Sequence, residues 1–189
     1  FYAPKVTGKL ALVEIQPELA DMAKRSIAMN ELTQRVSVIE SDMKAIFEDI
    51  QPGSVETVLS NPPYFPLNET TKTNHDKHYQ LARHELTIDL PGLAQVVNKL
   101  LKNNGKFYMV HRPDRLADIF AAFASRKLMI KRIQFVYGKA NREANMVLIE
   151  AIKSGRPGGV RIMPPIIAYT SENNYTKAVS DILYGTSWS

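Results

Sequence analysis

Residues 9–30 read KLALVEIQPELADMAKRSIAMN, and the period of the apolar residues changes from strand-like to helix-like within this stretch. The apolar run at residues 9–15 is typical of a buried strand. Pro17 follows in the first turn of a helix expected over residues 17–32, where its missing N–H costs nothing. One face of that helix carries Leu19, Met22, Ala23 and Ile27. The stretch therefore predicts a strand followed directly by a helix.

The same alternation continues along the chain. Further strands are expected at residues 36–39, 55–59, 106–111, 130–137 and 144–152. Further helices are expected at residues 43–50, 90–101, 113–127 and 177–184. Asp89 can cap the helix that begins at residue 90, and Gly105 stands where the end of that helix needs a left-handed residue. In the following helix Ile119, Phe120 and Phe123 are expected to point inward.

The last two strands are joined by residues 138–143 only, which is too short for a helical crossover, so they should be antiparallel. The whole order predicts an α/β fold with a mostly parallel twisted sheet, helices on both faces and a C-terminal antiparallel hairpin. We expect residues 1–189 to form a single domain. Ligand sites on such sheets lie beyond the carboxyl ends of the strands.

Composition narrows the classes of function. The 189 residues are 44% apolar and 23% charged, which is typical of a globular domain. The absence of cysteine excludes disulfides, thiolate zinc sites and a cysteine nucleophile. His75 and His78 lack partners at metal-ligand spacing, so we expect no metal. No apolar run approaches the ~20 residues of a membrane span, so we expect no membrane partner and a cytoplasmic location. The net charge of +5 permits a polyanionic partner such as nucleic acid.

Polar residues follow three of the expected strands directly. Glu14 ends the first, Asp42 follows the second, and Asn61 follows the third. An acid at such a strand end typically accepts two hydrogen bonds from a ribose diol, and the next acid could accept from an adenine amine. The alternative is that Glu14 and Asp42 cap the helices that follow them.

The third strand ends in Asn61-Pro62-Pro63-Tyr64. Two prolines fix the backbone and remove two donors, which leaves carbonyl groups and the Asn61 amide oxygen to accept from a planar amine. Tyr64 offers a flat face for the ring that carries this amine. Such a pocket suits attack by a neutral amine on an electrophilic methyl group. The alternative is a rigid turn after a strand.

These residues together resemble the class I S-adenosylmethionine-dependent N-methyltransferases. The stretches NPPYF, ARHE (residues 82–85), HRPDRL (residues 111–116) and REANMVLIE (residues 142–150) are most similar to the bacterial tRNA(Val) adenine N6-methyltransferase-like family. The resemblance implies S-adenosylmethionine as cofactor and a Rossmann-like sheet. The implied catalytic residues are Asn61, Pro62, Pro63 and Tyr64. The implied cofactor-binding residues are Glu14, Ile15, Asp42, Met43 and Asn61.

The chain departs from this family at its start. The family carries a glycine-rich loop after its first strand, whereas Gly8 is the one glycine upstream of Glu14. We therefore expect that the chain is N-terminally incomplete, that the first strand of the sheet is absent, and that cofactor binding is weakened.

The resemblance implies RNA as the partner, and the family to which the chain is similar implies tRNA. Phe65, Arg83 and Arg112 are the expected substrate-binding residues, with the arginines on phosphates. Two alternatives stay open. The acceptor could be a glutamine side chain of a protein or a base in DNA or rRNA. The chain could also be a non-catalytic RNA-binding fragment without a cofactor loop.

Overall fold

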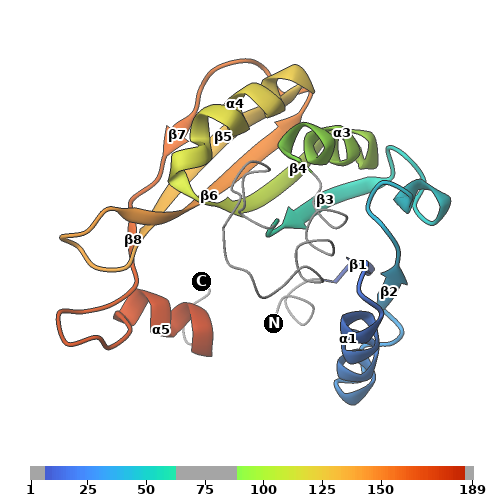
Figure 1. The fold of residues 1–189 in the computed structure, drawn as a ribbon, viewed down its shortest axis with the longest axis horizontal. Helices are drawn as coiled ribbons and strands as arrows, with labels where there is room; N and C mark the ends of the chain where they lie inside the picture. Colours follow the sequence, from blue (N-terminus) through green and yellow to red (C-terminus); the bar gives the residue numbers. More distant parts are fainter. Residues whose placement is uncertain (1–6, 63–88, 186–189) are drawn as a thin grey trace, which may run out of the picture. The chain divides into compact units, whose positions relative to one another are not determined.

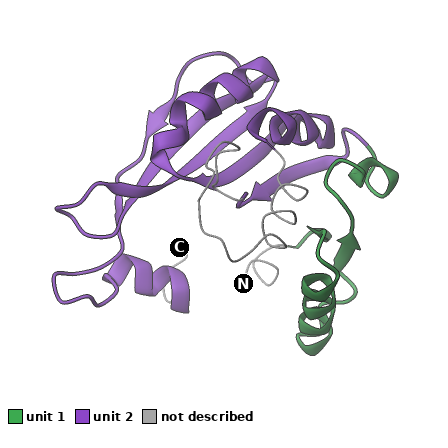
Figure 2. Ribbon diagram, in the orientation of Figure 1, with its two compact units in different colours: residues 1–51, 72–88 green, residues 52–71, 89–189 purple. Residues whose placement is uncertain are grey.

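The structure is a computed structural model, and it describes residues 7–62 and 89–185. The chain divides into two compact units, shown in Figure 2. The described part of unit 1 is residues 7–51, and that of unit 2 is residues 52–62 and 89–185. Pro63, Tyr64, Phe65 and Arg83 lie outside the described residues, so the predictions made for them stay predictions.

Unit 1 contains the predicted strand–helix–strand arrangement. Strand β1 (Leu10–Glu14) pairs in parallel with β2 (Val36–Glu40), and helix α1 (Pro17–Met29) lies between them in the chain. Pro17 occupies the first turn of α1 as predicted. The helix expected at residues 43–50 is only a short 3₁₀ turn, η2 (Ile46–Glu48).

The prediction of a buried first strand is wrong for β1. Leu12 is 45% exposed and Val13 37%, and on the expected apolar face of α1 Met22 is 57% exposed. Ala20 and Ile27 are the buried residues of that helix. The physical reason is that β1 has one strand neighbour, β2, within the described residues, so few side chains are available to cover it.

Unit 2 is built on a mixed sheet (Figure 1) with the strand order β3-β4-β6-β5-β7, and β8 also pairs with β5. The strands are β3 (Val55–Ser60), β4 (Leu101–His111), β5 (Leu128–Tyr137), β6 (Ala144–Lys153), β7 (Arg161–Ile162) and β8 (Ile166–Ile167). Strands β3 and β4 are parallel, whereas β6 is antiparallel to both of its neighbours. The predicted antiparallel hairpin is therefore confirmed.

Helices α3 (Leu90–Leu100) and α4 (Leu116–Ser125) lie over one face of this sheet (Figure 1). Asp89 caps α3 as predicted, because its Oδ1 accepts a hydrogen bond from the Gly92 N–H at 2.8 Å. A 3₁₀ turn, η3 (Pro113–Arg115), precedes α4, and helix α5 (Lys177–Tyr184) ends the described chain. None of the described helices has the length and apolar character needed to cross a membrane.

The core of unit 2 lies between the sheet and these two helices. The rings of Phe107 in β4 and Phe123 in α4 lie 5.4 Å apart, and Ile119 is fully buried. Phe120, however, is 42% exposed, so the prediction that it points inward is wrong. It follows Ile119 directly, and one residue rotates the side-chain direction by about 100° around a helix.

The role predicted for Gly105 is also wrong. Helix α3 already ends at Leu100, and Gly105 lies inside β4. The left-handed residue here is Asn104, with a φ of 63°. Gly105 is instead a point of close backbone approach, since a Cβ there would lie 2.9 Å from the Lys102 carbonyl oxygen and 3.2 Å from that of Glu56.

Candidate active site

The two acids of unit 1 lie at the same edge of its parallel strand pair. Glu14 is paired with Glu40, and the Ser41 N–H donates to the Glu14 carbonyl oxygen at 3.1 Å. Asp42 follows Ser41 directly. Glu14 and Asp42 thus follow adjacent strands at their carboxyl ends, each with its expected neighbour, Ile15 or Met43, next in the chain.

Each of these carboxylates accepts a hydrogen bond from the backbone N–H of the residue two positions later in the chain. The Gln16 N–H donates to Glu14 Oε1 at 2.9 Å, and the Lys44 N–H donates to Asp42 Oδ1 at 2.8 Å. Gln16 immediately precedes α1, so Glu14 does satisfy a backbone donor at the start of this helix, as the capping alternative requires. A carboxylate has about four acceptor positions, so one such bond leaves capacity for ligand hydroxyl or amine groups.

In unit 2 the carboxyl ends of β3 and β4 lie side by side. Ser60, the last residue of β3, is paired with Met109 of β4, and His111 ends β4 two residues later. Asn61 and Pro62 follow Ser60 at this edge. Asn61 is exposed, whereas Pro62 is buried. The described half of the Asn-Pro-Pro-Tyr stretch is thus an exposed asparagine followed by a buried proline.

His111 is a residue of this edge that the sequence reasoning did not select. It is 2% exposed, and its Nδ1 accepts a hydrogen bond from the Arg112 N–H at 2.8 Å. That bond requires an unprotonated Nδ1 in the neutral ring. Burial is the main cause that lowers the pKa of His111. The sequence signal was the alternation of Phe107, Met109 and His111, which places all three on the buried face of β4.

Arg112, expected to hold substrate phosphates, is exposed and carries a bidentate ion pair. Its Nε and Nη2 donate to Asp114 at 3.2 and 2.7 Å, and the two side chains are 58% and 55% exposed. Arg115 similarly binds Asp118 at 2.6 Å. Exposed ion pairs contribute only about 0–1 kcal/mol, so a phosphate group can compete for Arg112.

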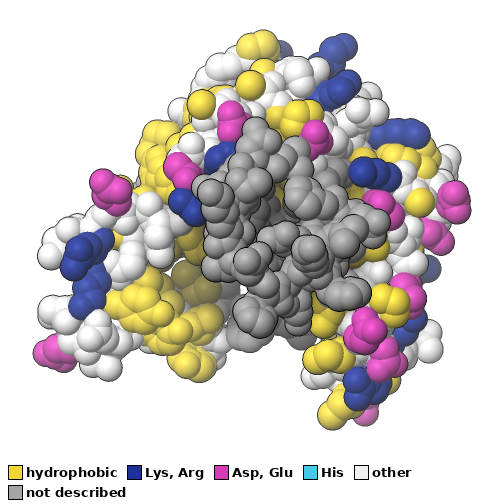
Figure 3. Space-filling model, viewed as in Figure 1, with side chains coloured by type: hydrophobic (Ala, Val, Ile, Leu, Met, Phe, Trp, Pro, Cys, Tyr) yellow, Lys and Arg dark blue, Asp and Glu magenta, His cyan; other side chains and the backbone are white. Residues whose placement is uncertain are grey.

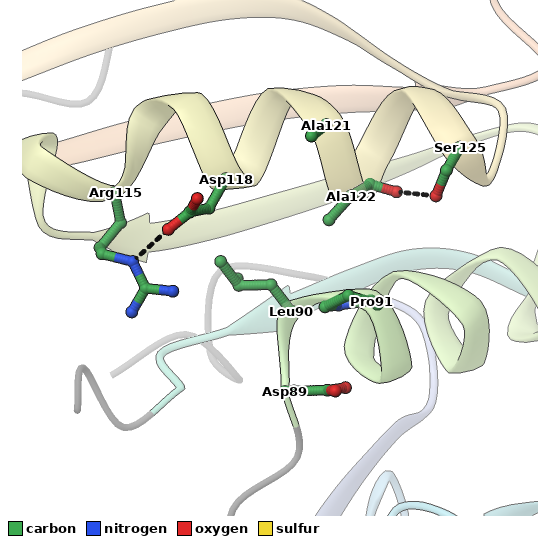
Figure 4. A pocket seen from close by; sticks show the side chains of 8 residues that line it. All are labelled: Asp89, Leu90, Pro91, Arg115, Asp118, Ala121, Ala122 and Ser125. Carbon is green, nitrogen blue, oxygen red and sulfur yellow. Dashed lines mark hydrogen bonds and ion pairs between the residues drawn. The ribbon is translucent and has the colours of Figure 1, made fainter. Parts of the chain in front are cut away.

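A shallow groove of about 500 Å³ lies between the start of α3 and α4. Figure 4 shows the Arg115–Asp118 pair on one side of it and Leu90 and Pro91 on the other. The groove is lined by Asp89, Leu90, Pro91, Arg115, Asp118, Ala121, Ala122 and Ser125. Of the expected catalytic and cofactor-binding residues, none of those that the structure describes lines it.

A second polar cluster crosses the middle of the sheet in unit 2. Glu150 of β6 lies opposite Tyr108 of β4 and Arg132 of β5, and Arg132 Nε donates to Glu150 Oε2 at 3.0 Å. Burial by itself would raise the pKa of Glu150, but hydrogen bonds from Arg132 and Tyr108 hold that pKa below its usual value. The cluster links three strands and is a structural feature of the sheet.

The fold defines the class of protein to which this chain is similar. A solved structure of an Agrobacterium tumefaciens protein, described as a predicted O-methyltransferase, matches with a TM-score of 0.71 and 22% identity, over 95% of this chain and 78% of that one. The fold is thus the Rossmann-like fold of class I methyltransferases, which confirms the predicted fold class.

Comparison of sequences finds similarity to a narrower group of proteins than comparison of folds does. No protein-family model matches the chain. A tRNA1(Val) (adenine(37)-N6)-methyltransferase of Porphyromonas gingivalis is 26% identical over 73% of this chain and 54% of its own length. The enzyme of the same name from Aeromonas hydrophila is 30% identical over 75% of this chain and 57% of its own length. These relatives confirm the resemblance drawn from the motifs. The chain spans little more than half of their length.

Proposed function

We propose that this chain carries the catalytic residues of an S-adenosylmethionine-dependent N-methyltransferase whose acceptor is the N6 amine of an adenine in tRNA. The observation that carries the proposal is the exposed residue Asn61, followed by the buried Pro62, at the carboxyl edge of β3 in a methyltransferase fold. The sequence similarity to tRNA adenine N6-methyltransferases supports the choice of acceptor.

The chemistry of the acids in unit 1 fits the proposed cofactor. Glu14 ends β1 and Asp42 lies just beyond the end of the adjacent parallel strand β2, and both keep acceptor capacity beyond their bonds to Gln16 and Lys44. Glu14, with Ile15, would accept from the two ribose hydroxyl groups, and Asp42, with Met43, would accept from the adenine amine. S-adenosylmethionine supplies the methyl group when it is bound.

On the acceptor side, Asn61 and the backbone carbonyl of Pro62 would accept the two N–H groups of the target amine. This fixes the direction of the nitrogen lone pair, so positioning rather than a strong base lowers the barrier. The nitrogen gains the methyl group, and one of its protons is released to solvent. The adenine must leave its stack to reach this point, with Pro63, Tyr64 and Phe65 expected to receive the ring.

Binding of the tRNA itself would depend on phosphate contacts. Arg112 can exchange its exposed ion pair with Asp114 for a phosphate, and Arg83 is expected to add a second contact. Each such contact makes affinity fall as the salt concentration rises.

The test is transfer of a tritiated methyl group by the wild-type chain and by Asn61→Ala, with Asn141→Ala, also exposed, as the matched control. We expect Asn61→Ala to lose transfer by about 100-fold or more, as expected for removal of a positioned acceptor, with an unchanged melting temperature. Normal turnover by Asn61→Ala would refute the assigned site.

The acceptor is tested in the same assay by offering tRNA, rRNA, DNA and protein separately. Transfer to protein glutamine or to DNA or rRNA, but not to tRNA, would replace the proposed acceptor with one of the alternatives. Calorimetry with S-adenosylmethionine covers the remaining alternative, because absence of both binding heat and transfer would favour a non-catalytic RNA-binding role.

A further inference from the structure

Two stacked tyrosine rings lie on the surface of unit 2, in the segment after the last long strand. The rings of Tyr169 and Tyr175 are 5.1 Å apart with an angle of 21° between their planes. The two residues are 39% and 43% exposed, so the pair is not covered by the described protein. A hydrogen bond with Tyr169 raises the pKa of Tyr175 above its usual value.

The backbone holds this pair in place before any partner binds. Tyr169 and Tyr175 form an antiparallel bridge, and the Thr170 N–H donates to the Asn174 carbonyl oxygen at 2.9 Å. The Tyr169 N–H donates to the Gly138 carbonyl oxygen, also at 2.9 Å, which attaches the tyrosine pair to the turn between β5 and β6. Such preorganisation reduces the entropy lost on binding.

That turn supplies positive charge beside the rings. Lys139 Nζ donates to the Ser171 carbonyl oxygen at 3.2 Å, which places its ammonium group against the loop between the two tyrosines. Arg142, in the same turn, is exposed. Figure 3 shows lysine and arginine side chains beside a hydrophobic patch in this part of unit 2. Glu143 and Glu172 are the nearby acids in sequence.

We propose that Tyr169 and Tyr175 form a stacking site for an unpaired base of RNA, with Lys139 and Arg142 on the flanking phosphates. Exposed aromatic faces beside basic groups are how proteins hold single-stranded nucleotides, because every base presents a flat π face and every linkage a negative charge. The choice of RNA rests on the proposed tRNA substrate. Tyr169 and Tyr175 are not among the residues proposed to hold the target adenine, so this site would bind another nucleotide of the RNA.

Fluorescence anisotropy with a labelled RNA stem-loop tests the proposal on the 189-residue chain. We expect the double variant Tyr169→Leu/Tyr175→Leu to bind about 5- to 150-fold more weakly, the range measured for loss of one base–aromatic stack. Tyr175→Phe keeps the ring and should bind normally. Tyr184→Leu is the matched control, since Tyr184 is 75% exposed in the same segment and stacks on no ring among the described residues.

A fully paired RNA duplex of equal length separates stacking from charge. The duplex offers phosphates but no unpaired base, so the tyrosine variants should bind it as the wild type does. Lys139→Met should weaken the binding of both the duplex and the stem-loop. Equal loss for duplex and stem-loop, or no loss for either, would overturn the proposal.

Photocrosslinking gives an independent measurement should the double variant unfold. A loop carrying 5-iodouridine should crosslink to the peptide with Tyr169 or Tyr175 in the wild-type chain, and crosslinks confined to other peptides would overturn the proposal.

Failure of the stacking site is distinguishable from failure of the proposed function. Methyl transfer to tRNA with an unchanged KM in the tyrosine variants would refute only the stacking site, whereas stem-loop binding without any transfer would refute only the enzyme assignment.

Discussion

His111 illustrates how burial at a single residue makes stability depend on pH. Its ring is 2% exposed, and burial lowers its pKa below the usual 6.5. The unfolded chain therefore binds a proton at this residue at a higher pH than the folded chain does. We expect the free energy of unfolding to fall as the pH drops from 7 through 6.5 and below, because protonation favours the unfolded state.

The variant His111→Gln isolates this contribution, because glutamine has no titratable group. Urea unfolding at pH 7.5 and pH 5.5 should show a smaller loss of stability for the variant than for the wild type. An identical loss in both proteins would mean that other groups cause the pH dependence. The comparison uses the difference between the two pH values, so a constant cost of replacing the ring does not affect it.

At the scale of the element, Gly105 in β4 leaves little room for a Cβ, because the Lys102 carbonyl of the same strand and the Glu56 carbonyl of β3 both lie close to it. A Cβ at Gly105 would lie 2.9 and 3.2 Å from two backbone carbonyl oxygens, which can move only with their strands. Gly105→Ala should lower the free energy of unfolding by about 1–3 kcal/mol, the usual cost of overpacking. Thermal or urea unfolding measures it.

Gly138→Ala, at the glycine that follows β5, is the matched control for the substitution at Gly105. A Cβ at Gly138 meets no atom within 4 Å, so the substitution should be neutral or stabilise by up to about 1 kcal/mol through the unfolded chain. Equal effects of the two substitutions would show that the approach of β4 to the Glu56 backbone is not tight in solution.

At the scale of the whole molecule, the sequence predicted the bounds of helices and strands better than it predicted which of their side chains are buried. The apolar period placed β5, β6 and α3 within one or two residues, because each has a regular buried face. The same period could not show that β1 is largely exposed, since exposure depends on neighbours supplied by distant parts of the chain. The strand-end rule selected Glu14, Asp42 and Asn61, but the burial of His111 depends on pairing between β4 and β6.

The two units should also differ in local stability. Among the described residues, unit 1 has four buried hydrophobic residues, Ala20, Ile27, Val36 and Ile46. In unit 2, β6 is flanked by β4 and β5, and all three strands carry fully or nearly fully buried side chains. Because apolar burial is the main favourable contribution to folding, opening β1 and β2 should cost less free energy than opening β6.

Native-state hydrogen exchange measured by mass spectrometry tests this difference directly. Peptides covering β1 and β2 should exchange faster than peptides covering β4, β5 and β6, and mild denaturant should remove protection from unit 1 first. Both sets of peptides contain parallel or antiparallel ladder bonds, so hydrogen bonding alone does not predict the order. Equal protection throughout would mean that the two units open in one cooperative step, and that the exposed apolar residues of β1 and α1 do not weaken unit 1.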